Sequence, residues 1–519
     1  MRVVMPEEMA ALDRAAIEGG IPSRDLMERA GRAVAEQARD MLGLCTGKKI
    51  CVVAAKGNNG GDGFVAARYL DSWDAEVEVF FVGSDDGMTG DTAENRRRYL
   101  EAGGALQVAG SRTAAGPCDC DLVIDAIFGT GFRGEAKGEY GKVIDAIEAS
   151  GLPVLAVDVP SGADAARGTV TGPAVRAVRT VTFAWPKAGL YLFPAAERVG
   201  ELVVADIGIP HELLSEVVES DIHTIEEDAV MERLPRRSSG VHKGECGRVL
   251  IVAGSTGLTG AAVLCARSAM RAGAGVVTLG IPASLNPIFE VKLTEVMTLP
   301  LPDEDRGHLA EGALETVVDA LSGYDVLALG PGLGTAPATC KVVVGLLREV
   351  EKPVILDADG INCIASDTAC LAGRKSPTVI TPHPGELGRL LNRKAGEIQN
   401  ARLDSILEAV RGFGCVVVLK GANTMIAAPG GQVFINPLAL PGLATAGSGD
   451  VLTGCTAALC AQGLDPLDAA LCGVFTHGKA AEIAAHLIGP VGMVAGDVVS
   501  QLPLALSGLL RKKEGGWKR

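Results

Sequence analysis

One short stretch, residues 443–454 with the sequence LATAGSGDVLTG, combines small residues with a single acid where a helix begins. Gly447, Ser448 and Gly449 come directly before Asp450, and an apolar run follows. Backbone amides at a helix start hold anions, and a carboxylate beside them takes the proton of an attacked hydroxyl group. The alternative is a capped helix start, although a cap alone does not need flanking glycines. The stretch therefore predicts phosphoryl chemistry with Asp450 as the base.

A second glycine-rich stretch, KGNNGGDGFVAARYL over residues 56–70, follows an expected strand and precedes an expected helix. Its four glycines allow successive N–H groups to point at an anion, and its two asparagines add side-chain donors and acceptors. The alternative is a plain turn in which Asp62 caps the helix. We interpret the stretch as a ligand-binding loop.

Two more strand ends carry polar residues. Residues 125–138, DAIFGTGFRGEAKG, match G-x-G-x-x-G, but the match follows an inner strand and does not open a helix at once. The stretch therefore predicts a flexible loop over a phosphate-bearing ligand rather than the dinucleotide-binding fingerprint of a nicotinamide dehydrogenase. In VDVPSG, residues 157–162, Asp158 is a candidate general base or ligand of a sugar hydroxyl, and Ser161 offers an oxygen to a cation. A loop-capping role for Asp158 is the alternative.

The second half of the chain repeats this arrangement of polar loops after strands. They are AGSTGLTGAAVL (253–264), LGPGLG (329–334), TPHPGELGRLL (381–391) and VLKGANTMI (418–426). His383 is fixed between two prolines, with a surface histidine of no special role as the alternative. Lys420 and Thr424 are candidates for contacting nucleotide phosphate. No G-x-x-x-x-G-K-[ST] occurs, which excludes a P-loop enzyme.

These loops need a sheet to position them. Short β-branched runs alternate with helical stretches, which is typical of a parallel α/β sheet covered by helices on both faces. A charged stretch ending in Ser-Ser-Gly interrupts the alternation, so we place a domain boundary between residues 222 and 242. The charged C-terminus, RKKEGGWKR, is expected to be a frayed tail.

Composition narrows the function classes. A chain of 519 residues suggests at least two domains. It has no uninterrupted apolar run of about 18 residues, and acids occur within its first ten residues, so neither a membrane span nor a secretory signal is expected. The 13 cysteines lack metal-ligand spacing, which indicates a reduced, cytoplasmic protein. A net charge of −15 disfavours nucleic acid and anionic membranes but permits a small anionic ligand held by local amides.

Taken together and in this order, the motifs resemble those of the bifunctional NAD(P)H-hydrate repair enzymes over nearly the whole chain. The resemblance implies a Rossmann-like NAD(P)HX epimerase domain over residues 1–222, a linker over 223–241, a ribokinase-like ADP-dependent NAD(P)HX dehydratase domain over 242–511 and a flexible tail over 512–519. Such enzymes interconvert the R and S epimers at C6 of the hydrated dihydronicotinamide ring. They then dehydrate the S form with ADP, by phosphorylation of the C6 hydroxyl and loss of phosphate.

The resemblance also assigns site residues. In the first domain it places the hydrated cofactor on Asn58, Asn59, Gly60, Gly61, Asp62, Gly129, Thr130, Gly131, Phe132, Arg133, Gly134, Glu135 and catalytic Asp158, and potassium on Asn59, Asp125 and Ser161. In the second it places the hydrated cofactor on Ala262, Gly334, His383 and catalytic Asp450, and the nucleotide on Lys420, Gly421, Ala422, Asn423, Thr424 and Gly449. Mg²⁺ is expected on the phosphates without a dedicated ligand cluster, and a homo-oligomer is expected from the family.

Two departures from the family pattern and two competing functions need a test. Before GNNGGDG this chain has AAK, where the family more often has a small or Pro-containing turn, and Lys56 is expected to face solvent, with a position near a ligand phosphate as the alternative. The family usually has Gly where this chain has Ala446, and a methyl group fits there only if the residue's φ is negative. The first domain is alternatively a non-catalytic binding or dimerisation module, which the intact motifs disfavour. The second is alternatively a kinase of a small alcohol, which differs in leaving its phosphate on a stable product.

Overall fold

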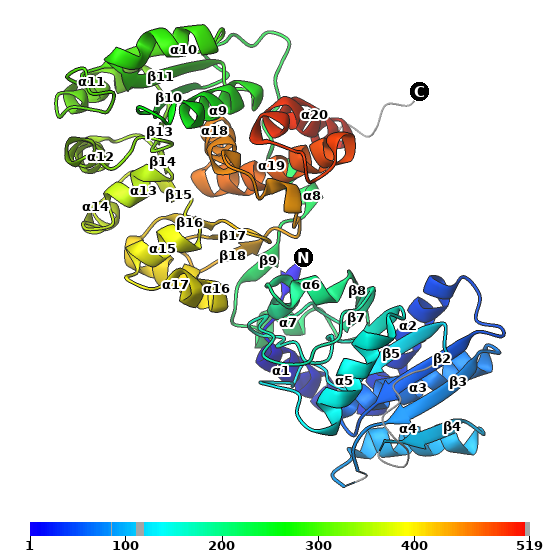
Figure 1. The fold of residues 1–519 in the computed structure, drawn as a ribbon. Helices are drawn as coiled ribbons and strands as arrows, with labels where there is room; N and C mark the ends of the chain where they lie inside the picture. The colour runs from blue at the N-terminus through cyan, green and yellow to red at the C-terminus, as the bar shows by residue number, and fades with distance from the viewer. Residues whose placement is uncertain (85, 110–118, 514–519) are drawn as a thin grey trace. The chain divides into compact units, whose positions relative to one another are not determined.

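The computed structural model describes residues 1–84, 86–109 and 119–513 of the chain. It divides after Ile222 into an N-terminal unit and a C-terminal unit, each with its own sheet and core (Figure 1). Helix α8 (Glu227–Arg233), within the predicted linker, buries Val230 in the core of the C-terminal unit. Of the predicted tail, residues 514–519 lie outside the described part of the chain.

The N-terminal unit alternates strands with helices, as the sequence predicts. Its elements are β1 (Arg2–Val3), α1 (Pro6–Glu18), α2 (Ser23–Leu42), β2 (Lys49–Ala54), α3 (Asn58–Ser72), β3 (Glu76–Phe81), α4 (Gly90–Glu101), β4 (Ala105–Val108), β5 (Leu122–Ala126), α5 (Glu139–Ser150), β6 (Val154–Val157), β7 (Arg179–Phe183), α6 (Ala196–Val199), β8 (Glu201–Ala205) and α7 (Leu213–Val217).

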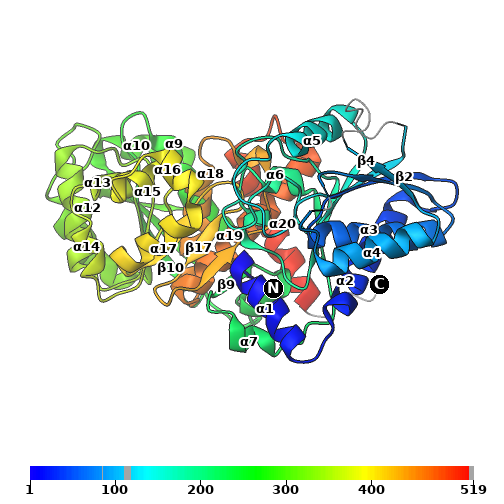
Figure 2. The ribbon, with the colours of Figure 1, turned by 90° about the horizontal axis from the view of Figure 1, so that it is seen from below.

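The N-terminal sheet is parallel and has the strand order β4-β3-β2-β5-β6-β7-β8. Successive residues of a strand face opposite sides of the sheet. In β2, Val52 therefore joins the core under α2 and α3, whereas Val53 joins the core under α5. Helices α3 and α4 lie along one side of this sheet and α5 along the other (Figure 2). The unit is thus the predicted three-layer sandwich.

The C-terminal unit begins within β9 (Ile222–Thr224), and α8 follows. The elements that follow are β10 (Arg248–Val252), α9 (Thr259–Arg271), β11 (Val276–Pro282), α10 (Asn286–Lys292), β12 (Met297–Leu301), α11 (Ala313–Ala320), β13 (Val326–Leu329), α12 (Pro337–Glu349), β14 (Val354–Leu356), α13 (Asp359–Cys363), α14 (Ala369–Ala372), β15 (Thr378–Ile380), α15 (Pro384–Leu390), α16 (Ala395–Asn400), α17 (Arg402–Phe413), β16 (Val416–Leu419), β17 (Met425–Ala427), β18 (Val433–Ile435), α18 (Ser448–Ala461), α19 (Pro466–Ile488) and α20 (Ala495–Lys513).

Its sheet continues from β9 in the order β18-β17-β16-β15-β14-β13-β10-β11-β12. The strands from β16 to β12 are parallel, whereas β17 and β18 pair antiparallel at the other end. The polar loops after β10, β13, β14, β15 and β16 therefore end at one edge of the sheet, which is where ligands of open α/β sheets bind. The predicted α/β class is confirmed in both units.

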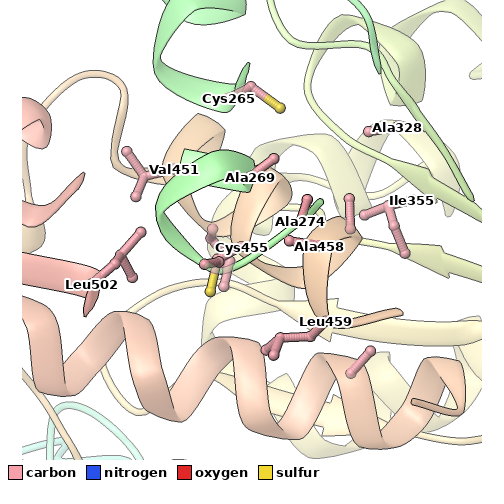
Figure 3. Close-up of a cluster of buried hydrophobic side chains, with 14 of the residues drawn as sticks. Cys265, Ala269, Ala274, Ala328, Ile355, Val451, Cys455, Ala458, Leu459 and Leu502 are labelled. Atoms are coloured by element: carbon pink, nitrogen blue, oxygen red, sulfur yellow. The ribbon is translucent and has the colours of Figure 1, made fainter. Parts of the chain in front are cut away.

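The core of the C-terminal unit is built around the crossing of α9 and α18. Figure 3 shows Cys265 and Ala269 of α9 beside Val451 and Cys455 of α18, with Leu502 of α20 packed nearby. The small side chains let the two helices approach closely, and this fixes the start of α18 above the sheet. Within the described residues, the helices lack the length and apolar character that crossing a membrane requires.

Gly454 is the position at which this helix contact is tightest. A methyl group there would lie 2.0 Å from the carbonyl oxygen of Cys265. We expect Gly454→Ala to destabilise the C-terminal unit by about 3 kcal/mol through overpacking, measured as the free energy of unfolding in urea. Gly412→Ala on α17 is the matched control, because a methyl group there meets no neighbour within 4 Å. Its helix propensity should stabilise by about 0.5–1 kcal/mol. Equal effects of the two substitutions would contradict the packing argument.

Candidate functional site

The N-terminal unit contains a cavity of about 900 Å³ beside β2 and β5, where the strand order reverses. Doubly wound sheets bind ligands at such a reversal. Many predicted contacts line it, whereas Gly60, Gly61, Gly134 and Glu135 are outside its lining. The predicted residues that line it are Asn58, Asn59, Asp62, Gly129, Thr130, Gly131, Phe132, Arg133 and Asp158.

Asp158, directly after β6, is the charged centre of the cavity. Its Oδ1 accepts hydrogen bonds from Lys187 Nζ at 2.7 Å and Thr182 Oγ1 at 3.1 Å, and its Oδ2 accepts from the Thr130 amide at 3.0 Å and the Thr130 hydroxyl. Burial raises the pKa of Asp158, but the Lys187 ammonium and the hydrogen bonds outweigh burial, so the pKa lies below its ordinary value. Asp158 is therefore a carboxylate at neutral pH, and its partners lie outside its own loop.

Lys187, which the sequence analysis missed, is almost fully buried beside Asp158. Only 1% of its side chain is exposed, and its Nζ also donates to Thr182 Oγ1 at 3.0 Å and to the Phe183 carbonyl at 3.1 Å. All three N–H groups of the ammonium are thus satisfied within the protein. Lys187 therefore serves first to fix and ionise Asp158.

Two further carboxyl groups line the same cavity. Burial raises the pKa of Asp62 on α3 well above its ordinary value, and the negative charges of Asp158 and Asp13 raise it further. Burial also raises the pKa of Asp13 on α1 to about 6, although Lys187 partly offsets this. An ionised carboxylate and a protonated carboxyl therefore face one cavity, which is the arrangement that acid–base chemistry requires.

Asn59 points toward the same space. It is 8% exposed, and its Nδ2 has no hydrogen-bond partner in the described residues. A methyl group at Gly129 would lie 3.0 Å from Asn59 Oδ1 and 3.1 Å from Asp158 Oδ2. An unsatisfied buried amide costs about 1–3 kcal/mol. The Asn59 amide is therefore available to a ligand that enters beside Gly129.

Gly60, in the glycine-rich stretch of residues 57–63, has a packing role that the sequence did not reveal. Helix α3 begins at Asn58 with Gly57 as its N-cap, so the alternative of an Asp62 cap is wrong. A methyl group at Gly60 would lie 1.7 Å from the Ala55 carbonyl oxygen. Gly60 thus lets the start of α3 rest against the end of β2, which brings Asn58 and Asn59 to the cavity.

Asp125 and Ser161, two of the three predicted potassium ligands, contact each other. Asp125 is fully buried, its Oδ1 accepts from Ser161 Oγ at 2.6 Å, and its Oδ2 accepts from the Ser161 amide at 2.8 Å. Burial raises the pKa of Asp125 to about 6, although the hydrogen bonds from Ser161 partly oppose this. A buried carboxylate and a hydroxyl suit a hard cation such as potassium, whereas Asn59 lies toward Gly129.

The glycine loop after β5 forms the outer wall. Helix α5 begins only at Glu139, which agrees with the prediction of a loop rather than a dinucleotide fingerprint. Arg133 donates to the carbonyls of Thr130 at 3.0 Å and Phe132 at 2.8 Å and so stiffens the loop. The Phe132 ring stacks on Phe128 with centroids 4.6 Å apart, which gives the cavity an apolar surface.

In the C-terminal unit, Asp450 lies in the first turn of α18. The N-cap is Gly447 with φ of 90°, so the helix start is capped by a glycine of the loop; no side-chain cap bond is made, and Asp450 does not cap the helix. Burial, together with the negative charge of Asp357, raises the pKa of Asp450 to about 7, although the Lys420 ammonium partly opposes this. A general base works best with a pKa near the working pH. Ala446 is not among the described residues with positive φ, so its methyl group fits the loop.

Lys420, after β16, connects three elements at the start of α18. Its Nζ lies 2.6 Å from Asp357 Oδ1 and 3.7 Å from Glu386 Oε2, and Asp357 Oδ2 accepts from Thr453 Oγ1 at 2.7 Å. Burial lowers the pKa of Lys420, but the two carboxylates more than reverse this. A methyl group at Gly449 would lie 3.2 Å from the Lys420 Nζ. The ammonium and the helix amides thus border one space, as phosphate binding requires.

His383 is exposed at the surface, but it has a structural role there. It is the N-cap of α15, where its Nδ1 accepts from the amides of Gly385 at 2.9 Å and Glu386 at 3.3 Å. The Glu386 carboxylate accepts from the His383 amide at 2.8 Å. Partial burial lowers the pKa of His383, and so does the Lys420 charge, although Glu386 opposes them. The ring is therefore neutral, with its proton on Nε2 beside Glu386.

The remaining predicted cofactor contacts lie in different surroundings. Gly334 has φ of 69°, and its amide donates to Asp359 Oδ2 at 2.9 Å, so it lies at the loop edge. Ala262 is fully buried on α9 and belongs to the core. The structure brings Asp450 and Lys420 together at the start of α18 and leaves Ala262 beneath that edge.

The predicted nucleotide loop is held from below. Gly421 has φ of 139°, and the buried Arg402 donates to the two carbonyl groups that precede it at 3.1 and 3.4 Å. Asn423 donates to the carbonyl group after β18 at 3.0 Å, and the Thr424 hydroxyl donates to the Gly421 carbonyl at 3.0 Å. The Thr424 hydroxyl thus shapes the loop, while Ala422 and the loop backbone are exposed at its tip.

Lys187, Asp13, Asp357 and Glu386 are the site residues that sequence reasoning missed. Asp357 follows a strand in ILDADG, and Glu386 is in the TPHPGE motif, which also follows a strand. Polar residues after parallel strands are candidates for ligand binding, so the sequence contained a signal for both. Lys187 lies in AWPKAG, shortly after β7, so the same signal, a polar residue after a strand, was present for it. Asp13 lies on an amphipathic helix, where nothing local distinguishes it from a surface acid.

The chain matches known families over both units. Residues 249–504 match the family described as NAD(P)H-hydrate dehydratase, and residues 23–189 match the family described as YjeF-related protein N-terminus. The bifunctional NAD(P)H-hydrate repair enzyme Nnr of Moorella thermoacetica is 44% identical over 99% of this chain and 98% of its own length. The enzyme of the same name from Thermofilum pendens is 42% identical over 98% and 97%.

A solved structure is similar to the C-terminal part. The ADP/ATP-dependent NAD(P)H-hydrate dehydratase of Bacillus subtilis, co-crystallised with ATP and Mg²⁺, is 31% identical. The match covers 56% of this chain and 99% of that one, with a TM-score of 0.48.

An acid-lined cavity in one α/β unit, and a helix start that brings Asp450 and Lys420 together in the other, are the candidate sites of a two-domain enzyme. The chain belongs to the bifunctional NAD(P)H-hydrate repair enzymes. The family predicted from the motifs is thereby confirmed, with an epimerase half and a dehydratase half. The roles of individual residues stay predictions.

The buried Lys187–Asp158 pair yields a stability prediction. Removing one partner of such a pair leaves an uncompensated charge and costs about 3–5 kcal/mol. We expect Lys187→Met to destabilise the N-terminal unit by this amount at neutral pH, measured by urea unfolding. Lys142→Met, at an exposed position on α5, is the control and should change stability by less than about 0.5 kcal/mol.

The destabilisation should depend on pH. The wild-type pKa of Asp158 is depressed, so its pairing stabilises the fold above the unfolded pKa, and this stability is lost as pH falls through the folded pKa. In the variant, burial without the ammonium raises the Asp158 pKa instead. The penalty should therefore shrink as the pH becomes mildly acidic and Asp158 binds a proton. A penalty independent of pH would attribute the effect to lost packing.

Proposed function

We propose that the N-terminal cavity interconverts R- and S-NADHX or NADPHX, and that the C-terminal site dehydrates the S form with ADP, releasing AMP and phosphate. One observation carries the second assignment. Asp450, with a pKa of about 7, shares the start of α18 with Lys420, so a base and an anion site lie together. A phosphoryl group and the hydroxyl that attacks it need this pair of features.

For epimerisation, the reacting group is a hemiaminal, because C6 carries both the hydroxyl group and the ring nitrogen. Asp158 takes the hydroxyl proton, the C6–N1 bond opens to an aldehyde, and the protonated Asp62 supplies the proton that N1 acquires. Rotation about the C5–C6 bond and reclosure with reversed proton transfers give the other epimer. The depressed pKa of Asp158 and the raised pKa of Asp62 support these roles.

For dehydration, Asp450 removes the proton of the C6 hydroxyl as its oxygen attacks the β-phosphorus of ADP, and AMP leaves. The amides at the start of α18 and the Lys420 ammonium stabilise the charge on the transferring group. The C6–O bond then breaks with phosphate as the leaving group, and loss of a proton from C5 restores the ring double bond. His383 and Gly334, at the neighbouring strand ends, are proposed to hold the hydrated ring.

The nucleotide loop has a supporting role in this proposal. Residues 420–424 with Gly449 are proposed to contact ADP, chiefly through the backbone groups that Arg402 and Asn423 hold in place. Among the described residues, no group of three or more His, Cys, Asp or Glu side chains is arranged to hold a metal ion. Mg²⁺ is therefore proposed to bind through the nucleotide phosphates.

Potassium is proposed at Asp125, Ser161 and Asn59. The fit rests on the buried Asp125 carboxylate, whose raised pKa a cation would bring down. Bound there, potassium would supply positive charge for an anionic ligand. A cytoplasmic location agrees with the described cysteines, none of which forms a disulfide with another. A homo-oligomer is proposed from the family resemblance.

The dehydratase proposal predicts a specific pH profile. Asp450 acts only when deprotonated, so kcat/KM with S-NADHX and ADP should rise with pH and reach half of its plateau near pH 7. Asp450→Asn should lower the rate by about 10²–10⁴-fold, followed as the near-ultraviolet absorbance of the reduced nicotinamide. Asp319→Asn, at an exposed position on α11, is the control. An unchanged rate in Asp450→Asn would remove Asp450 from the mechanism.

The epimerase proposal predicts a different defect. Given a mixture of epimers and ADP, the wild-type chain should convert both to NADH, whereas Asp158→Asn should stop when the S form is exhausted. The Asp450→Asn variant keeps the wild-type N-terminal cavity, so adding it as a source of epimerase activity should restore full conversion. Full conversion by Asp158→Asn alone would contradict the role of Asp158. A stable phosphorylated product in place of free phosphate would favour the small-alcohol kinase.

A further inference from the structure

The N-terminal cavity contains one cation that the proposed reaction does not use. Within the described residues, three cationic side chains, Lys56, Arg133 and Lys187, line the cavity together with five carboxyl side chains. Lys187 is paired with Asp158 at 2.7 Å, and Arg133 is paired with Glu7 at 2.8 Å. The Lys56 side chain is exposed, and its ammonium forms no ion pair with a carboxylate of the described residues. Lys56 is therefore the lining cation whose charge is available to a ligand.

The Lys56 ammonium is held in place but has spare donors. Its Nζ donates to the Asp86 carbonyl oxygen at 3.2 Å, and the described part of the chain offers it no other acceptor within hydrogen-bond distance. An ammonium group has three N–H groups. Two of them therefore remain for water or for a ligand in the cavity.

The starts of two helices meet at the backbone of Lys56. Helix α3 begins two residues later, at Asn58, and the amide of Thr89, the N-cap of α4, donates to the Lys56 carbonyl at 3.3 Å. Asn58 and Thr89 both line the cavity. The N–H groups in the first turn of a helix carry partial positive charge and bind phosphate groups. Asp91, in the first turn of α4, also lines the cavity and opposes this attraction, so an anion there needs the charge of Lys56.

A buried side chain at the start of α3 also lacks a partner. Asn59 lines the cavity and is 8% exposed, and its Nδ2 has no hydrogen-bond partner in the described part of the chain. Lys56 precedes Asn59 by three residues, so their Cα atoms lie at most about 11 Å apart. A ligand that extends from the Asn59 amide to the Lys56 ammonium would satisfy both groups.

We propose that Lys56 binds the pyrophosphate of the hydrated cofactor during epimerisation. In NADHX and NADPHX one ribose separates the hydrated ring from the pyrophosphate, whereas the 2′-phosphate of NADPHX is on the distant adenosine. A ring held at Asn59 and Asp158 therefore brings the pyrophosphate to Lys56. Lys56 is exposed, as the sequence predicts, and it also has the alternative role, contact with a ligand phosphate. The identity of the ligand rests on the proposed function, whereas the preference of this part of the cavity for an anion does not.

The test compares full-length wild type with Lys56→Gln, without ADP, so that epimerisation proceeds alone and is followed by chromatographic separation of the epimers. The substrates are R-NADHX, R-NADPHX and the hydrate of dihydronicotinamide riboside, which carries no phosphate. We expect Lys56→Gln to raise KM for both dinucleotides about tenfold with little change in kcat, because a charged hydrogen bond is lost. The two proteins should have the same kcat/KM for the riboside.

Two further variants complete the comparison. Lys56→Arg should keep most of the affinity, because a guanidinium group also binds phosphate. Lys142→Gln on α5 is the matched control, because Lys142 is exposed and is not part of the cavity lining. It should leave KM unchanged for all three substrates. Dehydration of S-NADHX with ADP should be unaffected in Lys56→Gln, because that site lies in the other unit.

A footprint gives a readout that does not depend on catalysis. Wild-type protein is acetylated with acetic anhydride, with and without NADHX, and the modified lysines are mapped by mass spectrometry. NADHX should slow the acetylation of Lys56 and leave that of Lys142 unchanged.

The outcomes separate this proposal from the proposed function. An equal loss of activity on the riboside would show that Lys56 acts through the structure of the cavity, and a KM change confined to NADPHX would place it at the 2′-phosphate. Either result would overturn the proposal, and so would acetylation of Lys56 that NADHX does not slow. A wild type in which NADHX protects Lys56 but the epimers do not interconvert would count against the proposed function alone.

Discussion

Each unit buries one lysine ammonium against one aspartate at the carboxyl edge of its sheet. The Lys187 Nζ lies 2.7 Å from Asp158, and the Lys420 Nζ lies 2.6 Å from Asp357. Each ammonium group keeps the carboxylate that it contacts ionised. It stabilises the negative charge of the other buried acids less, because they lie farther away and near that carboxylate. Asp62 and Asp450 therefore have raised pKa values, because burial and a neighbouring carboxylate both oppose their ionisation. The division of one positive charge among several acids thus gives each site both ionised and protonatable groups.

This electrostatic arrangement depends on close backbone packing. Gly60 allows α3 to rest on the end of β2, and Gly454 allows α18 to cross α9. Both contacts bring a helix start to the edge of a sheet, where the N–H groups of its first turn are available to a ligand. A side chain at either glycine would push the helix start away from the lysine–aspartate pair. The glycines therefore act through packing geometry, in addition to any contact with substrate.

The sequence was sufficient to predict the layers of helices and sheet and most of the polar loops, because hydrophobic alternation and glycine-rich strand ends are local signals. It predicted β2, β5, β6 and the strands from β13 to β16, and it placed Asp158 and Asp450 at strand or helix ends. It did not predict the short strands β4, β12 and β17, whose runs are brief and partly polar.

Contacts between distant segments were also beyond local patterns. Lys187 meets Asp158 across neighbouring strands, and the relation of Lys420 to Asp357 needs three strands in register. The sequence therefore indicated which loops hold the candidate site residues but not which carboxyl groups carry protons. That distinction follows from burial and partner charges, which only the folded chain defines.

The charge of the whole chain sharpens this conclusion. A protein of net charge −15 repels phosphate-bearing ligands at long range. Lys187 and Lys420 are already paired with aspartates, so they do not present full positive charges to an anion, whereas Lys56, which also lines the N-terminal cavity, is exposed. Oriented amides at the starts of α3 and α18 are proposed to add to the attraction, because their partial charges act at short range and do not add to the net charge. Such sites distinguish ligands by shape and hydrogen-bond geometry more than by total charge. This fits an enzyme that must recognise a damaged nicotinamide cofactor among intact ones carrying the same phosphates.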